Sequence, residues 1–142
     1  MNYVELSAVQ KKLDVGKSVS FKVMCEDKSL ASVPGGFAVN FQENHDDYAN
    51  IALQFNPRAK SSKVVLNTRI DKKWEKELYI VDRNLKGVYF GNPFELTINV
   101  KAKNQILVSV NGEFKTGYEC KVDITAVKYL CYAYGVKIIL DD

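Results

Sequence analysis

The 142 residues include 20 Lys and Arg against 17 Asp and Glu, so the net charge of +3 is small for a chain of this length. The charges are interspersed, and the absence of a long basic block in the sequence argues against nucleic acid as a partner. Hydrophobic residues make up 46% of the chain, which is enough for a packed core and too much for a disordered chain. The length predicts one domain that spans residues 1–142.

Few residues of the kinds that hold metals are present. The chain has one histidine, His45, and three cysteines, Cys25, Cys120 and Cys131, with no Cys-x-x-Cys pair. A structural zinc site usually requires about four Cys or His ligands at close spacing, so we expect neither a metal site nor another cofactor. The sparse, odd cysteine count predicts reduced and mostly buried thiols. His45 lies in the polar stretch of residues 43–47, where we expect a solvated side chain.

The first ten residues lack the basic region and apolar run of a secretory signal. No apolar stretch of the sequence approaches the length that spans a membrane, so we do not expect membrane insertion. We therefore expect synthesis in the cytosol. Action outside the cell would require export by a non-classical route, without a signal peptide.

Short alternating runs separated by turn residues recur along the chain. They are residues 19–23, 37–41, 50–58, 63–69, 74–81, 94–98, 105–110, 113–115 and 135–140. A period of two is typical of half-buried strands, and Asn111-Gly112 is a strong hairpin signal. Residues 124–134 are ambiguous and predict a short helical turn before a strand. This pattern indicates an all-β sandwich or barrel.

The run at residues 50–58 is central to the functional prediction. Ile51, Leu53 and Phe55 fall on one face of the expected strand, which we predict to be buried. The other face carries hydrogen-bonding side chains and continues through Arg58. Pro57 has no backbone N–H to donate, so regular pairing is expected to end there or to lie at an edge.

Polar residues of three consecutive strands are expected to meet on that face. They are Gln54, Asn56 and Arg58, then Asn67, then Trp74 and Glu77. Sugar hydroxyls both donate and accept hydrogen bonds, so amides and opposed charges suit them. An exposed indole offers a flat apolar surface to the C–H face of a pyranose ring. The structural alternatives are a core position for Trp74, amides that bond only to backbone, and an ordinary surface ion pair between Arg58 and Glu77.

In its motifs and their order the chain resembles the galectin family. The motifs are Phe37-Ala38-Val39-Asn40-Phe41, Ile51-Ala52-Leu53-Gln54-Phe55-Asn56-Pro57-Arg58, Val65-Leu66-Asn67-Thr68, Trp74-Glu75-Lys76-Glu77, Gly91-Asn92-Pro93-Phe94-Glu95-Leu96 and Val110-Asn111-Gly112. Asn-Pro-Arg alone is weak evidence. Its combination with Val-x-Asn and Trp-x-x-Glu, in that order within an all-β chain, is specific.

The resemblance implies a jelly-roll-like β-sandwich of two antiparallel sheets. It implies a lectin that binds β-galactosides on a concave face, without metal and without catalysis, so the partners would be glycoprotein or glycolipid glycans of the lactose or N-acetyllactosamine type. By position, Asn56 and Arg58 would bond near the galactose 4-hydroxyl, and Asn67 would take the 6-hydroxyl. Trp74 would stack under the ring, while Glu77 would hold Arg58 and reach the next sugar.

Three positions depart from the family pattern. The family usually has His at the position of Gln54, Gly at that of Glu75, and often Arg at that of Tyr79. A Gln amide also donates and accepts, but it is longer and loses more rotamer freedom when it is fixed. Loss of the Arg removes a cation near the second sugar. We therefore expect a weaker or shifted sugar preference rather than its loss.

Two other functions stay open at this point. The three departures favour a galectin-fold module that binds a protein partner, whereas the retained polar residues favour sugar. A glycosidase would use Glu75 and Glu77, but paired catalytic carboxylates normally come from different strands, so we expect no enzyme. The apolar segments Val4-Glu5-Leu6 and Ile138-Ile139-Leu140 are expected edge strands that would support a homodimer with two cross-linking sites.

Overall fold

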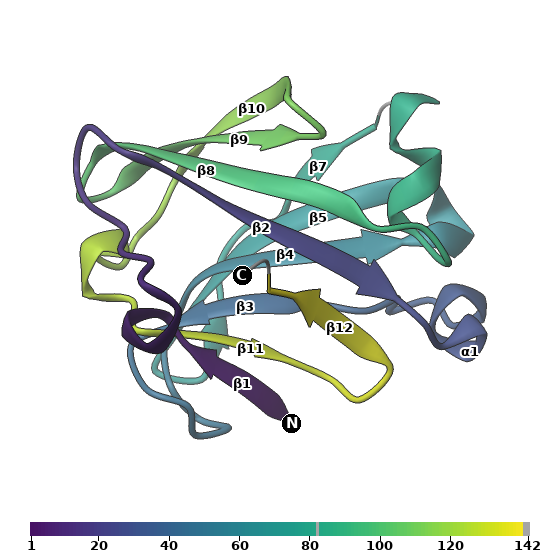
Figure 1. The fold of residues 1–142 in the computed structure, drawn as a ribbon, viewed down its shortest axis with the longest axis horizontal. Helices are drawn as coiled ribbons and strands as arrows, with labels where there is room; N and C mark the ends of the chain where they lie inside the picture. The colour runs from purple at the N-terminus through teal and green to yellow at the C-terminus, as the bar shows by residue number, and fades with distance from the viewer. Residues whose placement is uncertain (82, 141–142) are drawn as a thin grey trace.

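The computed structural model describes residues 1–81 and 83–140, so the last two residues of the predicted domain lie outside it. Within the described residues, two antiparallel sheets of seven and five strands pack against each other (Figure 1). This arrangement confirms the prediction of an all-β sandwich. It also confirms the two antiparallel sheets that the resemblance implied.

The seven-stranded sheet has the order β1-β11-β3-β4-β5-β6, with β7 also paired to β5. Its strands are β1 (Asn2–Glu5), β3 (Val39–Gln42), β4 (Ile51–Arg58), β5 (Lys63–Ile70), β6 (Lys73–Trp74), β7 (Leu78–Ile80) and β11 (Tyr129–Tyr132). Neighbouring strands therefore come from distant parts of the sequence, since β11 lies between β1 and β3.

The five-stranded sheet has the order β10-β9-β8-β2-β12. Its strands are β2 (Ser18–Cys25), β8 (Phe94–Ala102), β9 (Gln105–Val110), β10 (Glu113–Glu119) and β12 (Val136–Ile139). The predicted hairpin joins β9 to β10, and both turn residues have positive φ, 52° at Asn111 and 78° at Gly112. Two such residues in succession are typical of the tight turn that Asn-Gly favours.

Short helical segments connect the strands. They are η1 (Leu6–Val9), α1 (Lys28–Ser32), η2 (Ala59–Ser61), η3 (Arg83–Val88) and η4 (Ile124–Ala126). The ambiguous residues 124–134 contain η4 followed by β11, as predicted. The sequence analysis did not predict α1. Among residues 1–81 and 83–140, no helix is long and apolar enough to cross a membrane.

The core fills the space between the sheets. Phe41 packs edge-on against Phe21 with ring centroids 5.5 Å apart, and Phe55 lies 5.9 Å from Phe94, so each pair joins one sheet to the other. Cys25, Cys120 and Cys131 are free and buried, as predicted. We call the side of the seven-stranded sheet that faces away from this core the polar face.

A β-bulge in β4 places Ile51 on a different face of the sheet from the one expected. Ile51 pairs with Arg69 and Gln54 pairs with Asn67, so β4 holds one extra residue between these two positions. Cross-strand partners share a face, which places Ile51 on the polar face. Ala52 instead joins Leu53 in the core. The prediction that Ile51 is buried is confirmed, since the residue is 1% exposed, but the prediction that it shares a face with Leu53 and Phe55 was wrong.

Regular strand pairing was predicted to end at Pro57, and it ends there on one side of β4 only. Pairing with β3 ends at Phe55, opposite Val39, whereas pairing with β5 continues through Arg58, opposite Lys63. The missing N–H thus ends one ladder while the other extends to Arg58.

The predicted strand at residues 74–81 is divided into β6 and β7, which pair with opposite ends of β5. Between them the side-chain amide of Asn67 donates to the Glu75 backbone oxygen at 3.0 Å. The Glu75 backbone N–H still donates to the Thr68 oxygen at 2.9 Å, so a side chain supplies only the second of the two bonds at Glu75. Two residues of the predicted site lie here: Trp74 ends β6, and Glu77 lies within the break, directly before β7.

His45 is not simply a solvated loop side chain. Its ring stacks on Tyr3, with centroids 4.2 Å apart and an interplanar angle of 12°. It also lies edge-on to Tyr129 at 5.1 Å. The histidine is exposed, but it packs against two strands of the seven-stranded sheet, β1 and β11.

Candidate functional site

A hollow of about 350 Å³ lies on the polar face, where β4, β5 and the segment from β6 to β7 meet. The residues that line it are Gln54, Arg58, Asn67, Trp74, Glu75 and Glu77. Five of these six residues were predicted from the sequence. Trp74 is 46% exposed, so the alternative that it is a core residue was wrong.

Strand register explains why these side chains meet. Gln54 on β4 pairs with Asn67 on β5, and Asn40 on β3 pairs with Gln54. Arg69 on β5 pairs with Trp74 on β6. Because paired residues lie side by side on the same face, the register brings side chains of β3, β4, β5 and β6 together.

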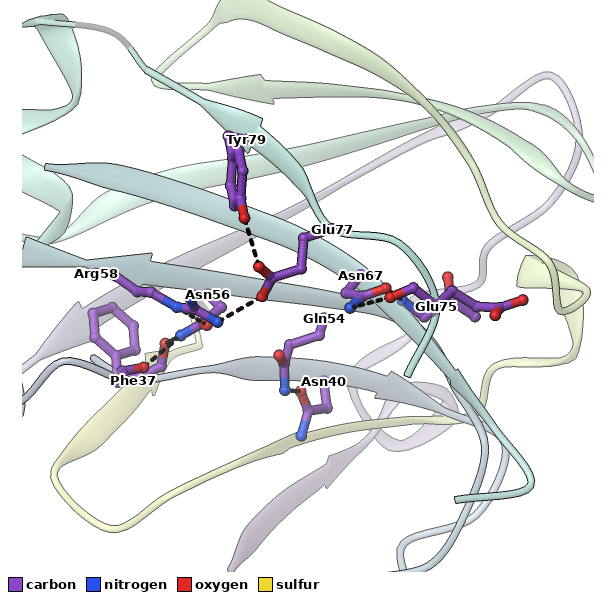
Figure 2. A network of polar contacts seen from close by, with 11 residues as sticks. Phe37, Asn40, Gln54, Asn56, Arg58, Asn67, Glu75, Glu77 and Tyr79 are labelled. Carbon is purple, nitrogen blue, oxygen red and sulfur yellow. Dashed lines mark hydrogen bonds and ion pairs between the residues drawn. The ribbon is translucent and has the colours of Figure 1, made fainter. Parts of the chain in front are cut away.

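Arg58 and Glu77 form the charged part of the site (Figure 2). Arg58 Nη2 lies 2.9 Å from Glu77 Oε2, and Arg58 Nε donates to Asn56 Oδ1 at 2.8 Å. The side chains of Arg58 and Glu77 are 25% and 34% exposed. A guanidinium carries five N–H donors, and these two bonds fix its plane while using two of them.

Tyr79 has a role that the sequence analysis missed. Its hydroxyl donates to Glu77 Oε1 at 2.8 Å, so the carboxylate is held from the side opposite Arg58 (Figure 2). This hydrogen bond is the main reason that the pKa of Glu77 lies below its ordinary value; partial burial opposes the shift and Arg58 adds to it. Tyr79 therefore holds the carboxylate as a neutral donor.

Asn56 lies behind the hollow rather than in it. Its side chain is 4% exposed, and its amide nitrogen donates to the backbone oxygens of Gly35 at 2.9 Å and Phe37 at 2.6 Å. Its oxygen accepts from Arg58. Of the six predicted residues, Asn56 is the one that does not line the hollow, and the structure shows it as a support for Arg58.

The other two amides are partly engaged as well. Gln54 Nε2 donates to Asn40 Oδ1 at 3.0 Å. Asn67 donates to the Glu75 backbone and accepts from the Thr68 backbone N–H at 2.8 Å. Each amide group keeps one N–H beyond these bonds. Asn40 was missed, although its place between Val39 and Phe41 in an alternating run puts it on the polar face.

An ion pair, two amides and a half-exposed indole on one rigid sheet face suit a ligand rich in hydroxyl groups. In the described part of the chain, no three His, Cys, Asp or Glu side chains come together in a way that would hold a metal. Fold and site together define a carbohydrate-binding β-sandwich.

The chain belongs to the galactoside-binding lectin family, the galectins, because the model of that family matches residues 5–140. It is therefore a galectin lectin domain and not an enzyme, so the glycosidase alternative no longer applies. A comparison of the sequence with curated proteins finds no match.

Solved galectin structures agree with this assignment. The chain is similar to a doubly substituted variant of human galectin-16, with a TM-score of 0.73 and 25% identity over 97% of this chain and 90% of the other. It shares its fold with sheep galectin-11 in complex with glycerol, with a TM-score of 0.70 and 23% identity over 99% and 93% of the two chains. It also shares its fold with Caenorhabditis elegans galectin LEC-6, with a TM-score of 0.70 and 16% identity over 96% and 85%.

Proposed function

We propose that the hollow binds the galactose unit of β-galactoside-containing glycans, with a weaker or shifted preference relative to galectins that carry His at the position of Gln54. The observation that carries this proposal is the hollow itself, in which an exposed indole lies beside two amides and an ion pair. Its lining combines the apolar surface of the indole with neutral amides, a positively charged donor and a negatively charged acceptor.

In this proposal the galactose ring stacks on Trp74, and its hydroxyls bond to Asn67 and Gln54. The next sugar lies over Arg58 and Glu77. A carboxylate accepts from hydroxyls and a guanidinium donates to them, so the pair serves hydroxyls of either orientation. Stacking on an indole removes the apolar C–H face of the sugar from water.

The weaker preference follows from bonds that the site already makes internally. One N–H of Gln54 is used by Asn40, and both N–H groups of Asn56 are used by backbone oxygens. A sugar hydroxyl near these residues therefore finds fewer free donors than the residue types alone provide. Each neutral hydrogen bond lost costs about 1 kcal/mol of binding free energy.

Calorimetric titration with lactose, followed in parallel by tryptophan emission, tests the proposal. Trp74 is the only tryptophan, so its emission reports directly on the hollow. We expect saturable binding with an emission shift for lactose and neither for maltose, which has no galactose. The variant Trp74→Leu should abolish the binding heat.

A second candidate is a galectin-fold module that binds a protein partner, and the enclosure of Asn56 favours it. The lactose titration separates the two functions. No heat and no emission change at about 10 mM lactose, together with no hit on a glycan array, would reject the lectin proposal in favour of this module.

We further propose that two copies associate through sheet edges, which would let a dimer cross-link glycans at the cell exterior after non-classical export. β1 and β12 are edge strands of their sheets, although Leu6 lies in η1 rather than in β1. Linking two sites raises avidity without new sugar contacts. Sedimentation velocity tests the association, and a monomer at high micromolar concentration rejects it.

A further inference from the structure

The backbone around Trp74 gives the indole little support. β6 consists of only Lys73 and Trp74, and the two preceding residues, Asp71 and Lys72, have positive φ values of 50° and 68°. The side chain of Trp74 is 46% exposed. A flat ring on a two-residue strand needs a side-chain contact to hold its plane.

The guanidinium of Arg69 supplies such a contact. Its Cζ lies 5.5 Å from the centroid of the indole, and Arg69 is the cross-strand partner of Trp74. Arg69 Nη2 donates to the backbone oxygens of Asp47 at 2.7 Å and Ala49 at 2.9 Å. The guanidinium is thus held by the β3–β4 loop, residues 43–50, while it lies against the indole.

The choice of arginine at this position has a cost. Arg69 Nε is buried and has no hydrogen-bond partner among the described residues, and a buried donor without a partner is destabilising. A lysine could donate to the same two carbonyl groups without leaving such an atom. What lysine lacks is a planar group that stacks on an aromatic face, which points to the contact with Trp74 as the reason for arginine.

Two further contacts join the β3–β4 loop to the turn before β6. The Asp71 backbone N–H donates to Asn50 Oδ1 at 2.9 Å, and Lys72 Nζ lies 4.7 Å from the Tyr48 ring centroid. With Arg69, three contacts therefore tie the loop to the segment that carries Trp74.

We infer that Arg69 is a positioning residue for sugar binding, which holds the plane of the Trp74 indole and anchors that ring to the β3–β4 loop. The inference rests on the proposed function for its effect on affinity. The holding of the indole itself does not depend on any ligand.

The test compares Arg69→Met, Arg69→Lys and the control Lys101→Met. Lys101→Met removes an exposed cation from β8 in the five-stranded sheet. For each variant we would measure acrylamide quenching and anisotropy of tryptophan emission without ligand, lactose affinity, and thermal unfolding. Arg69→Lys provides a second readout if Arg69→Met does not fold.

For Arg69→Met we expect stronger quenching, lower anisotropy and about tenfold weaker lactose binding. Arg69→Lys should unfold near the wild-type temperature, because the positive charge is kept. It should still show stronger quenching and lower anisotropy than the wild type, because lysine has no planar guanidinium to lie against the indole. Lys101→Met should match the wild type in the emission measurements.

Unchanged quenching and anisotropy in both Arg69 variants would overturn the inference. Equal affinity in the wild type and in a folded Arg69 variant with a freer indole would overturn its link to sugar binding. A wild-type chain that binds no lactose contradicts the proposed function instead, and the ligand-free emission then decides alone whether Arg69 holds Trp74.

Discussion

The carboxylate of Glu77 is held by Arg58 on one side and Tyr79 on the other, at 2.9 and 2.8 Å. Both donors stabilise its charged form. Tyr79 makes its bond without a charge of its own, and Lys63 Nζ lies 3.9 Å from the Tyr79 ring centroid. A tyrosine with a nearby lysine thus stands at the position where the family resemblance led us to expect arginine.

Sugar binding should therefore persist to lower pH than an ordinary glutamate would allow. The pKa of Glu77 is lowered from 4.5, so the carboxylate and the binding it supports are present above that value and are lost only as the pH falls through the lowered pKa. Tyr79→Phe removes the main cause, so the loss should move to higher pH. Lactose titrations of the wild type and of Tyr79→Phe from about pH 7 to pH 3.5 measure the pH at which binding is lost.

A matched control is Tyr134→Phe, which changes an exposed tyrosine that lines no part of the hollow. Its profile should coincide with that of the wild type. Identical profiles for all three proteins would contradict the role assigned to Tyr79.

Arg58→Lys should weaken lactose binding by about tenfold, or about 1.4 kcal/mol. A lysine keeps the charge but cannot bond to Asn56 and Glu77 in one plane while presenting further donors to a ligand. Calorimetry of Arg58→Lys, Glu77→Gln and the double variant measures the coupling free energy between Arg58 and Glu77 in lactose binding. Strictly additive losses would mean that the two residues act independently on the sugar.

At the scale of elements, two irregularities in strand pairing lie next to the site. The bulge in β4 moves Ile51 onto the polar face, and the break between β6 and β7 lets the Asn67 amide replace a ladder bond. Both lie where regular pairing would otherwise continue. Bulges next to functional residues commonly redirect side chains in this way.

The connection between α1 and β3 lies close to β4 at Gly36, and this close contact leads to a further prediction. Gly36 has a φ of +57°, and a Cβ there would collide with the Pro57 carbonyl group, whereas a Cβ on Gly35 would meet nothing within 4 Å. Gly36→Ala should therefore destabilise the protein by more than the roughly 1–2 kcal/mol of the backbone conformation alone. It should also weaken lactose binding, because Pro57 precedes Arg58.

Gly35→Ala is the matched control and should change the free energy of unfolding by less than about 0.5 kcal/mol. Denaturant unfolding and lactose titration of both variants provide the measurement. Equal stability of the two variants would contradict the close approach of Gly36 to β4.

At the scale of the whole molecule, burial keeps all three thiols away from solvent. Burial raises the pKa of Cys120 to about 12 and that of Cys131 to about 11, and it also raises the pKa of Cys25. The thiolate is the reactive form, so the folded protein should not react with a thiol reagent near pH 8.

We expect three thiols to titrate in denaturant and none in the native protein over minutes. A chromogenic disulfide reagent, added with and without guanidinium, provides the count. Rapid reaction of a native thiol would mean that the sandwich opens locally at that cysteine.

Much of the fold was predictable because it depends on local pattern. The alternation at residues 37–41 and 63–69 and the Asn111-Gly112 turn each follow from short-range sterics and hydrophobic burial. Trp74 and the ion pair between Arg58 and Glu77 were predictable for another reason, since residue type and the order of the galectin-like motifs indicated them, whereas Trp74 and Glu77 have opposite strand parity.

The remaining features depend on contacts between segments that are distant in sequence. The enclosure of Asn56 needs the backbone oxygens of Gly35 and Phe37, and the bond between Gln54 and Asn40 needs the β3–β4 register. The hydroxyl of Tyr79 reaches Glu77 through a side-chain conformation that residue type does not specify. No periodicity in the sequence encodes these partners.

By itself, the sequence determined an all-β fold, because strand parity follows from the period of two, and its ordered motifs carried the resemblance to galectins with an indole, amides and an ion pair at the site. Only the tertiary structure decided which of these groups are free to meet a ligand. That depends on register, the β4 bulge and the contacts of Arg69, and hydrogen bonds between distant strands form only once the sheet is assembled.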